Sequence, residues 1–301
     1  MQKGSGKSLN RAGHVFWAAQ IACQLEISAL KPGNVTWDRP FSDVAAEQFL
    51  ASSAAMGRAF FYIDRKRIGE LVLQAVMDTR EVVGCNTNLG IVLLVFPLAK
   101  AALKGSFDGL RERLVLELRS LTAIDTQEVY QAIRIASPGG LGVADRYDVK
   151  GLPPAKPLLY AMAEASERDS IAREYVTDFE ITFNTGIPVF EESANRGLFL
   201  RDAVTQTFLT ILSRFPDTLI ARKRGREEAE DVSAGAGRVL QAGTAGSDQW
   251  RNAVLAFDSS LRDLTNSLNP GTTADITVAV LFCEVLKALE EGTLPEMLRM
   301  W

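Results

Sequence analysis

Histidine and cysteine are scarce in this chain. Its 301 residues include one histidine, His14, and three cysteines. A His-rich metal centre is therefore excluded. A Ser-His-Asp arrangement would depend on His14, which lies early in an expected amphipathic helix, where a partly exposed, solvated histidine is the more common case. No C-x-x-C pair is present to indicate a redox or zinc site, so a reduced, cytoplasmic protein is the simplest expectation.

A basic charge excess and long apolar runs are also missing. Lys and Arg number 33 against 37 Asp and Glu, which gives a net charge of -4, so no global positive field would attract nucleic acid or anionic lipid. No run reaches the roughly 18 to 20 apolar residues of a membrane span, and the N-terminus lacks the apolar core of a signal peptide. We therefore expect neither a nucleic-acid partner nor a membrane partner.

The segment GSGKS, residues 4–8, resembles the end of a phosphate-binding P-loop. The full pattern is G-x-x-x-x-G-K-[ST] after a strand, and its first glycine would have to stand where the chain has Met1. No strand can precede that position, so the motif is rejected. We expect residues 1–8 to form a flexible basic tail instead.

Apolar residues at helical spacing, in contrast, are abundant. They follow a 3.6-residue period over 199–215, and similar stripes run through 13–28, 44–62, 67–82, 110–122 and 251–264. Segments 89–103 and 276–289 are apolar on most faces, which is typical of central helices. No stretch alternates cleanly as a strand does. The sequence therefore predicts an all-α fold, a multi-helix bundle with two central apolar helices.

The chain shows no linker and no internal repeat, so we expect a single domain over residues 1–301. Its 47% hydrophobic content is enough for a large core. The segment 225–248 is rich in Gly and Ala. Two interpretations remain open for it, a helix or a mobile lid.

Four polar or glycine-rich stretches interrupt the helical pattern. They are EISALKPGNVT (26–36), GCNTNL (84–89), SPGGLGVADRYD (137–148) and NSLNPGTTAD (266–275). Each one alone can be a helix cap or a tight turn, because Asn and Thr are good N-cap residues and glycine permits turns. Together they would direct several helix N-termini into a common space, which suits an anion.

One dense basic cluster stands in this acidic chain, within PDTLIARKRGR (216–226). Its cations are Arg222, Lys223, Arg224 and Arg226, and Asp217 lies just before them. A solvated charged face is the usual role of such a run. Contact with the phosphates of a ligand is the functional alternative.

Six segments of the chain, taken in order, resemble the triphosphoribosyl-dephospho-CoA synthase family. They are Glu26 with KPGNV, CNTNLGIVLLVFPLAKA, SPGGLGVADRYDV, ERDSIAREYVTDFEITF, PDTLIARKRG and LNPGTTADI, and they extend across almost the whole chain. The resemblance implies an all-helical enzyme that uses ATP and dephospho-CoA. Such an enzyme transfers the triphosphoribosyl group of ATP to the ribose 2'-hydroxyl of dephospho-CoA and releases adenine.

The chain departs from the family pattern after KPGNV. Better-known members have a segment with His and Asp there, whereas this chain reads TWDRPFSDV (36–44) without histidine. Asp43, or else Asp38, is left for that role. The KPGNV and ERDSIAREYV segments are more similar to homologues in archaea and one-carbon-metabolising bacteria. The acceptor is therefore expected to be dephospho-CoA or a related molecule.

The resemblance also implies roles for individual residues. A ribosyl transfer from ATP passes through an oxocarbenium-like state and needs a carboxylate near the sugar, a general base and cations on the phosphates. By analogy, Glu26 and Asp43 are candidates for the base and the sugar-side carboxylate, with Asp217 as a further catalytic candidate. The predicted phosphate contacts are Lys31, Arg222 and Lys223, and the predicted Mg2+ ligands are Asp148, Asp217 and Asp275, although helix capping is an alternative for Asp148 and Asp275. The other predicted nucleotide-binding residues are Asn34, Asn86, Thr87, Asn88, Gly139 and Gly140.

The sequence also leaves two other functions open, and it is compatible with a homo-oligomer. The first is an ATP-dependent phosphotransferase acting on an intermediate of a one-carbon coenzyme of the methanofuran or methanopterin type, which would release ADP or AMP rather than adenine. The second is a catalytically inactive nucleotide-binding regulator, which would bind ATP without turnover.

Overall fold

The computed structural model describes residues 5–42 and 44–300, and it confirms the all-α prediction. The first half contains α1 (Ser5–Ser28), α2 (Ala46–Phe60), α3 (Ile68–Val83), α4 (Leu89–Leu103), α5 (Leu110–Arg119), α6 (Ala123–Ala136) and α7 (Leu158–Ala165). The second half contains α8 (Ser170–Val176), the π-helical turn η1 (Thr182–Gly186), α9 (Ile187–Asn195), α10 (Leu200–Arg214), α11 (Thr218–Arg224), α12 (Arg226–Gln241), α13 (Asp248–Leu261), α14 (Gly271–Glu291) and α15 (Leu294–Arg299). Within these residues the sole β-type pairing is an isolated bridge between Thr36 and Arg39.

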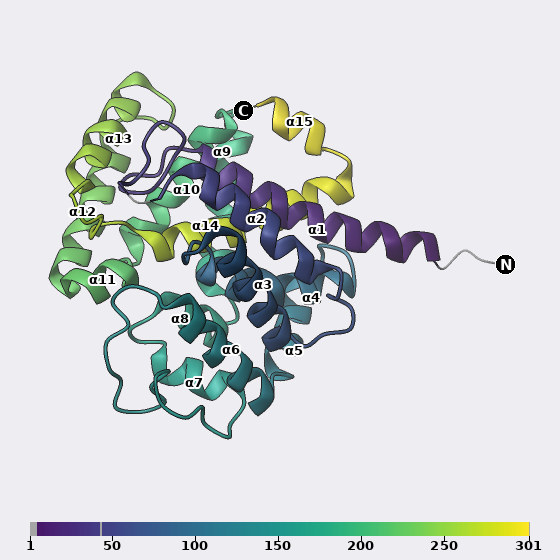
Figure 1. The fold of residues 1–301 in the computed structure, drawn as a ribbon. Coiled ribbons are helices and arrows are strands. Elements are labelled where there is room, and N and C mark those ends of the chain that lie inside the picture. Colours follow the sequence, from purple (N-terminus) through teal and green to yellow (C-terminus); the bar gives the residue numbers. More distant parts are fainter. Residues whose placement is uncertain (1–4, 43, 301) are drawn as a thin grey trace.

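The two helices predicted to be central are α4 and α14. Helix α14 runs through the middle of the molecule (Figure 1), where it packs against α1 and α4. Nearly every residue of α4 from Ile91 to Ala102 is buried, as are most residues of α14. A helix that is apolar around its whole circumference needs neighbours on every side, and these two helices have them.

Helices α10 to α13 form a second hydrophobic cluster, on the left of Figure 1. Trp250 and Phe208 are fully buried in it. The segment with two open interpretations, 225–248, contains α12 and the turn into α13, so the helix is the alternative that the structure shows. A Cβ at Gly235 would lie 2.5 Å from the ring of Phe257. Here glycine allows close helix packing.

The lower part of Figure 1 holds α6, α7 and α8 together with the long loop 137–157. The second half of this loop is tied to α6, because the Tyr130 hydroxyl donates to the carbonyl of Tyr147 (2.6 Å) and Arg134 donates to the carbonyl of Val149 (2.9 Å). The glycine-rich first half turns toward α11, where Gly140 contacts Arg222.

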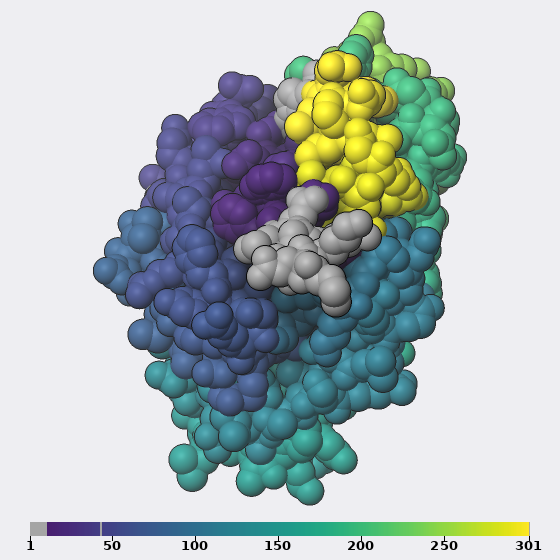
Figure 2. Space-filling model, turned by 90° about the vertical axis from the view of Figure 1, so that its right-hand side faces the viewer, coloured from purple at the N-terminus to yellow at the C-terminus, as the bar shows by residue number. Residues whose placement is uncertain are grey.

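The predicted flexible tail, residues 1–8, falls only partly on described residues. Residues 1–4 lie outside them, and the chain is helical from Ser5 onward, which corrects that part of the prediction. Figure 2 shows the C-terminal segment beside the N-terminal helix, in agreement with the packing of α1 on α14. Among the described helices, none combines the length and the apolar character that crossing a bilayer requires.

Candidate active site

A cavity of about 530 Å³ lies where the interrupting segments meet. Its wall takes residues from all six family-like segments: Asn34, Asn86–Gly90, Pro138–Ala144, Arg168–Asp169, Leu219 with Arg222 and Lys223, and Asn269 through Asp275 in part. These segments are far apart in the sequence. The prediction that several helix N-termini share one space is confirmed, since α4, α8, α11 and α14 all begin at this wall.

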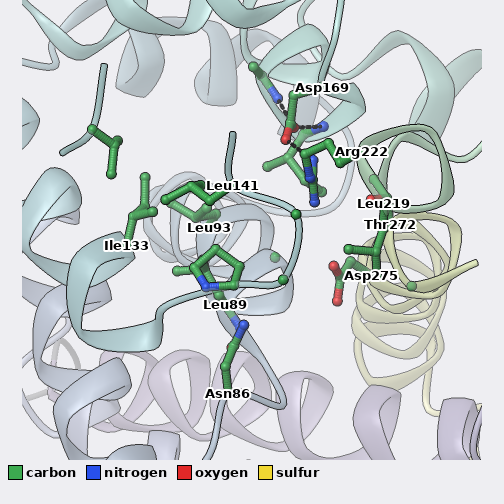
Figure 3. Close-up of a pocket in the computed structure, with 18 of the residues that line it drawn as sticks. Asn86, Leu89, Leu93, Ile133, Leu141, Asp169, Leu219, Arg222, Thr272 and Asp275 are labelled. Atoms are coloured by element: carbon green, nitrogen blue, oxygen red, sulfur yellow. Dashed lines mark hydrogen bonds and ion pairs between the residues drawn. The ribbon is translucent and has the colours of Figure 1, made fainter. Parts of the chain in front are cut away.

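One end of the cavity is charged (Figure 3). There the guanidinium of Arg222 donates to the carboxylate of Asp169 at 2.6 Å, and Asp275 lies on the neighbouring helix α14. The Nε of Arg222 is buried without a hydrogen-bond partner. A buried unpaired donor is costly, so a ligand oxygen at this point would satisfy it.

The carboxylate of Asp275 lies among three other carboxylates and one guanidinium. Burial and then the charges of Glu26, Asp217 and Asp169 raise its pKa well above the ordinary value, and Arg222 opposes them. No protein hydrogen bond reaches its side chain among the described residues. A Cβ at Gly90 would collide with this carboxylate, so glycine at the start of α4 lets Asp275 reach the cavity wall.

The other end of the cavity is apolar. Figure 3 shows Leu93, Ile133 and Leu141 on that side, away from Asp275. Further apolar lining residues are Leu89, Val129, Leu158, Met162, Ile171 and Ala172. A cavity with an apolar end and a few charged groups at the other is suited to a nucleotide, whose base is apolar on both faces and whose phosphates are anionic.

The Asn-Thr-Asn segment before α4 both caps the helix and lines the cavity. The Asn86 side chain accepts from the Leu89 amide (3.2 Å), and the Asn88 side chain donates to Thr79 Oγ1 (3.0 Å). The Thr87 hydroxyl makes a short hydrogen bond with that of Ser52. Of the three, Asn86 is exposed and Asn88 is buried, so Asn86 is the one best placed to face a ligand.

The glycine-rich loop packs on the basic helix α11. Gly140 has a φ of +72°, and a Cβ there would lie 3.0 Å from the Arg222 Cβ. A Cβ at Gly139 would lie 3.3 Å from the Cε of Lys223. All four residues line the cavity. The predicted nucleotide-binding glycines of the loop and the predicted phosphate contacts of α11 are therefore brought together.

Lys31 lies elsewhere. Its ammonium group is fully buried and donates to the carbonyls of Glu26 (2.5 Å) and Ala29 (3.1 Å), and it lies 3.2 Å from Glu26 Oε1. An ammonium has three donors, so none is left for the predicted phosphate contact. Glu26 and Asn34, by contrast, do line the cavity.

The three predicted metal ligands are not brought together. Asp217 is buried and does not line the cavity; its carboxylate accepts from the amides of Leu219 and Ile220, and from the amide and hydroxyl of Thr273. Asp148 lines the cavity, but it accepts from the amides of Ala144 and Lys150 in its own loop. Four hydrogen bonds use the lone pairs of Asp217. Of the three, Asp275 alone makes no hydrogen bond within the described residues, so both of its oxygens are available to a metal.

A protein-built metal cage is not found in the described part of the chain, where no group of three or more His, Cys, Asp or Glu side chains is arranged for one. Mg2+ commonly needs only one or two carboxylates together with substrate phosphates. The charged end of the cavity fits this kind of magnesium site, because the carboxylate residues Asp275, Asp169 and Glu26 all line the cavity. Burial first, and then the charges of these neighbouring carboxylates, raise the pKa of Asp275, and a cation would relieve the repulsion among them.

Asp43 lies outside the described residues, so its predicted role stays a prediction. Asp169, in contrast, was missed as an individual residue although it lies in the segment ERDSIAREYV. The signal was an Asp directly before a short apolar helix, as at Asp217. His14 lies on α1 with its ring near Trp17 and does not line the cavity.

Comparisons with known proteins match nearly the whole chain. The model of a family described as ATP:dephospho-CoA triphosphoribosyl transferase (CitG) matches residues 13–293. A Pseudomonas syringae pv. tomato protein named probable 2-(5''-triphosphoribosyl)-3'-dephosphocoenzyme-A synthase is 26% identical over 244 residues, which are 81% of this chain and 72% of that protein. A protein of the same name from Stutzerimonas stutzeri is 31% identical over 108 residues, or 36% of this chain and 37% of that protein.

A solved structure also matches. A crystal structure of an Archaeoglobus fulgidus protein, assigned as a triphosphoribosyl-dephospho-CoA synthase, superposes with a TM-score of 0.62 at 31% sequence identity. The match covers 79% of this chain and 98% of that one. It includes the all-helical architecture, so the fold and the sequence lead to the same group of proteins.

Proposed function

Since the chain belongs to the ATP:dephospho-CoA triphosphoribosyl transferase family and is therefore a transferase, we propose that its reaction takes place in the cavity described above. The observation that carries this proposal is the convergence of all six family-like segments on one cavity wall. Segments separated by up to about 240 positions in the chain (Asn34 to Asp275) meet there. A purely structural role would not require them to share a cavity.

The charged end is assigned to the triphosphate. Arg222 offers a planar fork of N–H donors that suits phosphate oxygens, and its unpartnered Nε supports this role. Lys223, Gly139 and Gly140 also line the cavity, and the glycine loop packs against Arg222 and Lys223 there. Asn86 lies at the start of α4, where free amides favour an anion.

Asp275 is the residue that would hold Mg2+ together with the phosphates. When bound, the ion would neutralise part of the triphosphate charge. The remaining predicted ligands keep structural roles, Asp217 as a helix cap and Asp148 as the organiser of its own loop. Asp275 is therefore the one protein ligand proposed for the metal, and Asp169 lies nearby.

Glu26 is assigned as the general base. In the transfer, the acceptor hydroxyl oxygen forms a bond to C1' of the ribose while the bond from C1' to adenine N9 breaks. Glu26 takes up the hydroxyl proton, and the departing adenine takes up a proton from solvent. A base placed at the wall is typically worth about 10²- to 10⁴-fold in rate. Asp43 remains the predicted sugar-side carboxylate.

The test is to identify the product. The protein is incubated with ATP, Mg2+ and dephospho-CoA, and the released bases and nucleotides are separated by chromatography. Adenine released in proportion to modified dephospho-CoA is the expected result. ADP or AMP would contradict the triphosphoribosyl transfer, and ATP binding without turnover would contradict catalysis. Reactions without acceptor, and with the variant Arg222→Ala, are the matched controls.

We place this reaction in the cytoplasm. The three cysteines, Cys23, Cys85 and Cys283, are all free, which supports a reducing compartment. Fractionation of the native cells, with activity followed in each fraction, tests the placement.

A further inference from the structure

Neither member of the ion pair of Glu26 and Lys31 is assigned a phosphate contact, and both side chains are buried. Lys31 is 0% exposed and Glu26 4% exposed. Removing two charges from water is costly, and the cost is offset only when the partners are close and the remaining donors are satisfied. Both conditions hold, since the ammonium meets the Glu26 carboxylate and two carbonyls.

The two members of the pair face different surroundings. Glu26 lines the large cavity, and it also lines a void of about 10 Å³ behind it together with Cys23, Ser53 and Asn88. Lys31 lines neither. Glu26 therefore borders the space that a substrate would occupy, whereas Lys31 does not.

The loop that carries Lys31 is held in place by contacts with α13 and with the start of α14. The amide of Gly33 donates to Asp258 Oδ1 (2.8 Å), and Arg262 donates to the carbonyl of Asn34 (2.7 Å). Gly33 has a φ of +77°, and a Cβ there would lie 3.0 Å from Leu261 and 3.1 Å from Pro270. These contacts with α13 and with the start of α14 leave Lys31 little freedom to swing into the cavity.

We propose that Lys31 is a positioning residue for the transfer: it holds Glu26 as a charged, oriented carboxylate at the cavity wall and makes no contact with ATP. The inference rests on the assignment of Glu26 as the base in the proposed function. It also gives the lysine of the KPGNV segment a role that its position in the sequence does not suggest.

The electrostatics of the pair support this role. Burial raises the pKa of Glu26, while the charge and hydrogen bond of Lys31 oppose that rise. Burial likewise lowers the pKa of Lys31, and Glu26 opposes it, with a smaller contribution from Asp258 on α13. The other titratable groups that couple to Glu26 are Cys23 on α1 and Asp275 on α14. Lys31 is the one cation among them, so without it the carboxylate would lose the group that keeps it charged.

A double-mutant cycle tests the inference. Glu26→Gln, Lys31→Met and the double variant are assayed for kcat and for the KM of ATP, with ATP and dephospho-CoA both varied. We expect Glu26→Gln to lower kcat by about 100-fold or more, and Lys31→Met to lower it by at least about tenfold with the KM of ATP within about twofold. In the Glu26→Gln background, Lys31→Met should change kcat by less than about twofold, because it acts through Glu26.

The matched control is Lys100→Met. Lys100 also donates to backbone carbonyls, of Ile63 (2.9 Å) and Lys66 (3.0 Å), but it does not line the cavity. The substitution Lys100→Met should leave kcat and the KM of ATP unchanged at a temperature where the variant is folded. A similar drop in kcat for Lys100→Met would show that losing an enclosed lysine is enough, and would overturn the inference.

The remaining outcomes are also decisive. A raised KM for ATP in both backgrounds would make Lys31 a phosphate contact, and equal losses of kcat in both would make its effect independent of Glu26; either result overturns the inference. If Lys31→Met does not fold, the step from Glu26→Gln to the double variant still tests the inference, because a loss of kcat greater than about twofold, or a raised KM for ATP, in that step would overturn it. Wild-type kcat in Glu26→Gln would remove the base assignment itself. A slow Glu26→Gln beside a fast Lys31→Met would remove only the role of Lys31.

Discussion

Two helix starts, those of α8 and α11, are built from the same local pattern and serve different ends. Each begins after an aspartate, Asp169 or Asp217, whose Oδ1 accepts from two amides of the first turn. The second oxygen differs. That of Asp169 pairs with Arg222 at the cavity, whereas that of Asp217 accepts from the amide and hydroxyl of Thr273 in the buried contact with α14.

The difference shows that an N-cap aspartate can be either part of a site or part of the core. The Asp169 side chain is 30% exposed, while Asp217 is 1% exposed. A partly exposed ion pair contributes little stability but leaves its cation available to a ligand. A buried carboxylate with four donors contributes to stability and has nothing left to offer a ligand.

The largest expected effect is on stability, from Asp217→Ala. The variant loses a helix cap and leaves the Thr273 donors without a partner, so unfolding should become easier by about 2 to 5 kcal/mol. Chemical denaturation measures the loss. A change within about 0.5 kcal/mol, as for an exposed charge, would contradict the buried role of Asp217.

The next effect is on binding, from Arg222→Ala. Removing a charge-assisted phosphate contact should weaken ATP binding by about 1.5 to 3 kcal/mol, or roughly ten- to a hundredfold. Lysine at this position should restore only part of the affinity, since it lacks the planar fork. Calorimetric titration with ATP gives both values. Wild-type affinity in both variants would remove Arg222 from the phosphate site.

A second buried carboxyl, Glu284 on α14, sharpens the contrast with Asp217 because its Oε1 is buried without a hydrogen-bond partner. Burial, and then the charge of Glu191, raise its pKa to about 8. The folded state therefore holds the proton more tightly than the unfolded state. Its contribution to stability is full below the unfolded pKa of about 4.5 and is lost as pH rises toward about 8.

The variant Glu284→Gln should remove this pH dependence, because the amide stays neutral. We expect it to be more stable than the wild type by about 1 to 3 kcal/mol near pH 9, with the difference shrinking toward pH 5. Denaturation at several pH values checks the trend. A difference that is constant with pH would contradict the raised pKa of Glu284.

The smallest expected change in stability comes from Asp169→Ala. The lost cap should cost about 1 kcal/mol, less than the loss at Asp217, since no buried donor is left unpaired. The KM of ATP should nevertheless rise, because Asp169 orients Arg222 at the cavity. Denaturation and steady-state kinetics on the same preparation separate the two effects. An unchanged KM would confine Asp169 to capping.

Much of the fold follows from local sequence. The apolar stripes over 67–82 and 89–103 correspond closely to α3 (Ile68–Val83) and α4 (Leu89–Leu103), because a 3.6-residue period and the following polar or glycine residues define both the buried face and the ends of a helix. The segment 225–248, in contrast, is compatible with either a helix or a mobile lid from its sequence alone. Its glycines resemble those of a flexible loop until the neighbouring ring of Phe257 is known.

The candidate site was predictable in its composition but not in its roles. The sequence motifs identified Glu26, Arg222 and Asp275 as candidates, and the structure brings these three residues to one cavity. The sequence also predicted that Lys31 contacts the phosphates and that Asp217 binds a metal. Both predictions arose because the partner of a buried cation or carboxylate cannot be identified from the neighbouring sequence. Their partners, Glu26 and Thr273, are identified only by the folded geometry.

The sequence by itself determined the helices, their caps and the family to which the chain belongs, since these depend on residue types at short spacing. Tertiary structure alone decided which charged groups face the cavity. Asp169 and Asp217 have equivalent local surroundings, and burial against α14 distinguishes them. The physical reason is that desolvation and hydrogen-bond satisfaction depend on neighbours brought from elsewhere in the chain, and these neighbours decide whether a charge is free to meet a substrate.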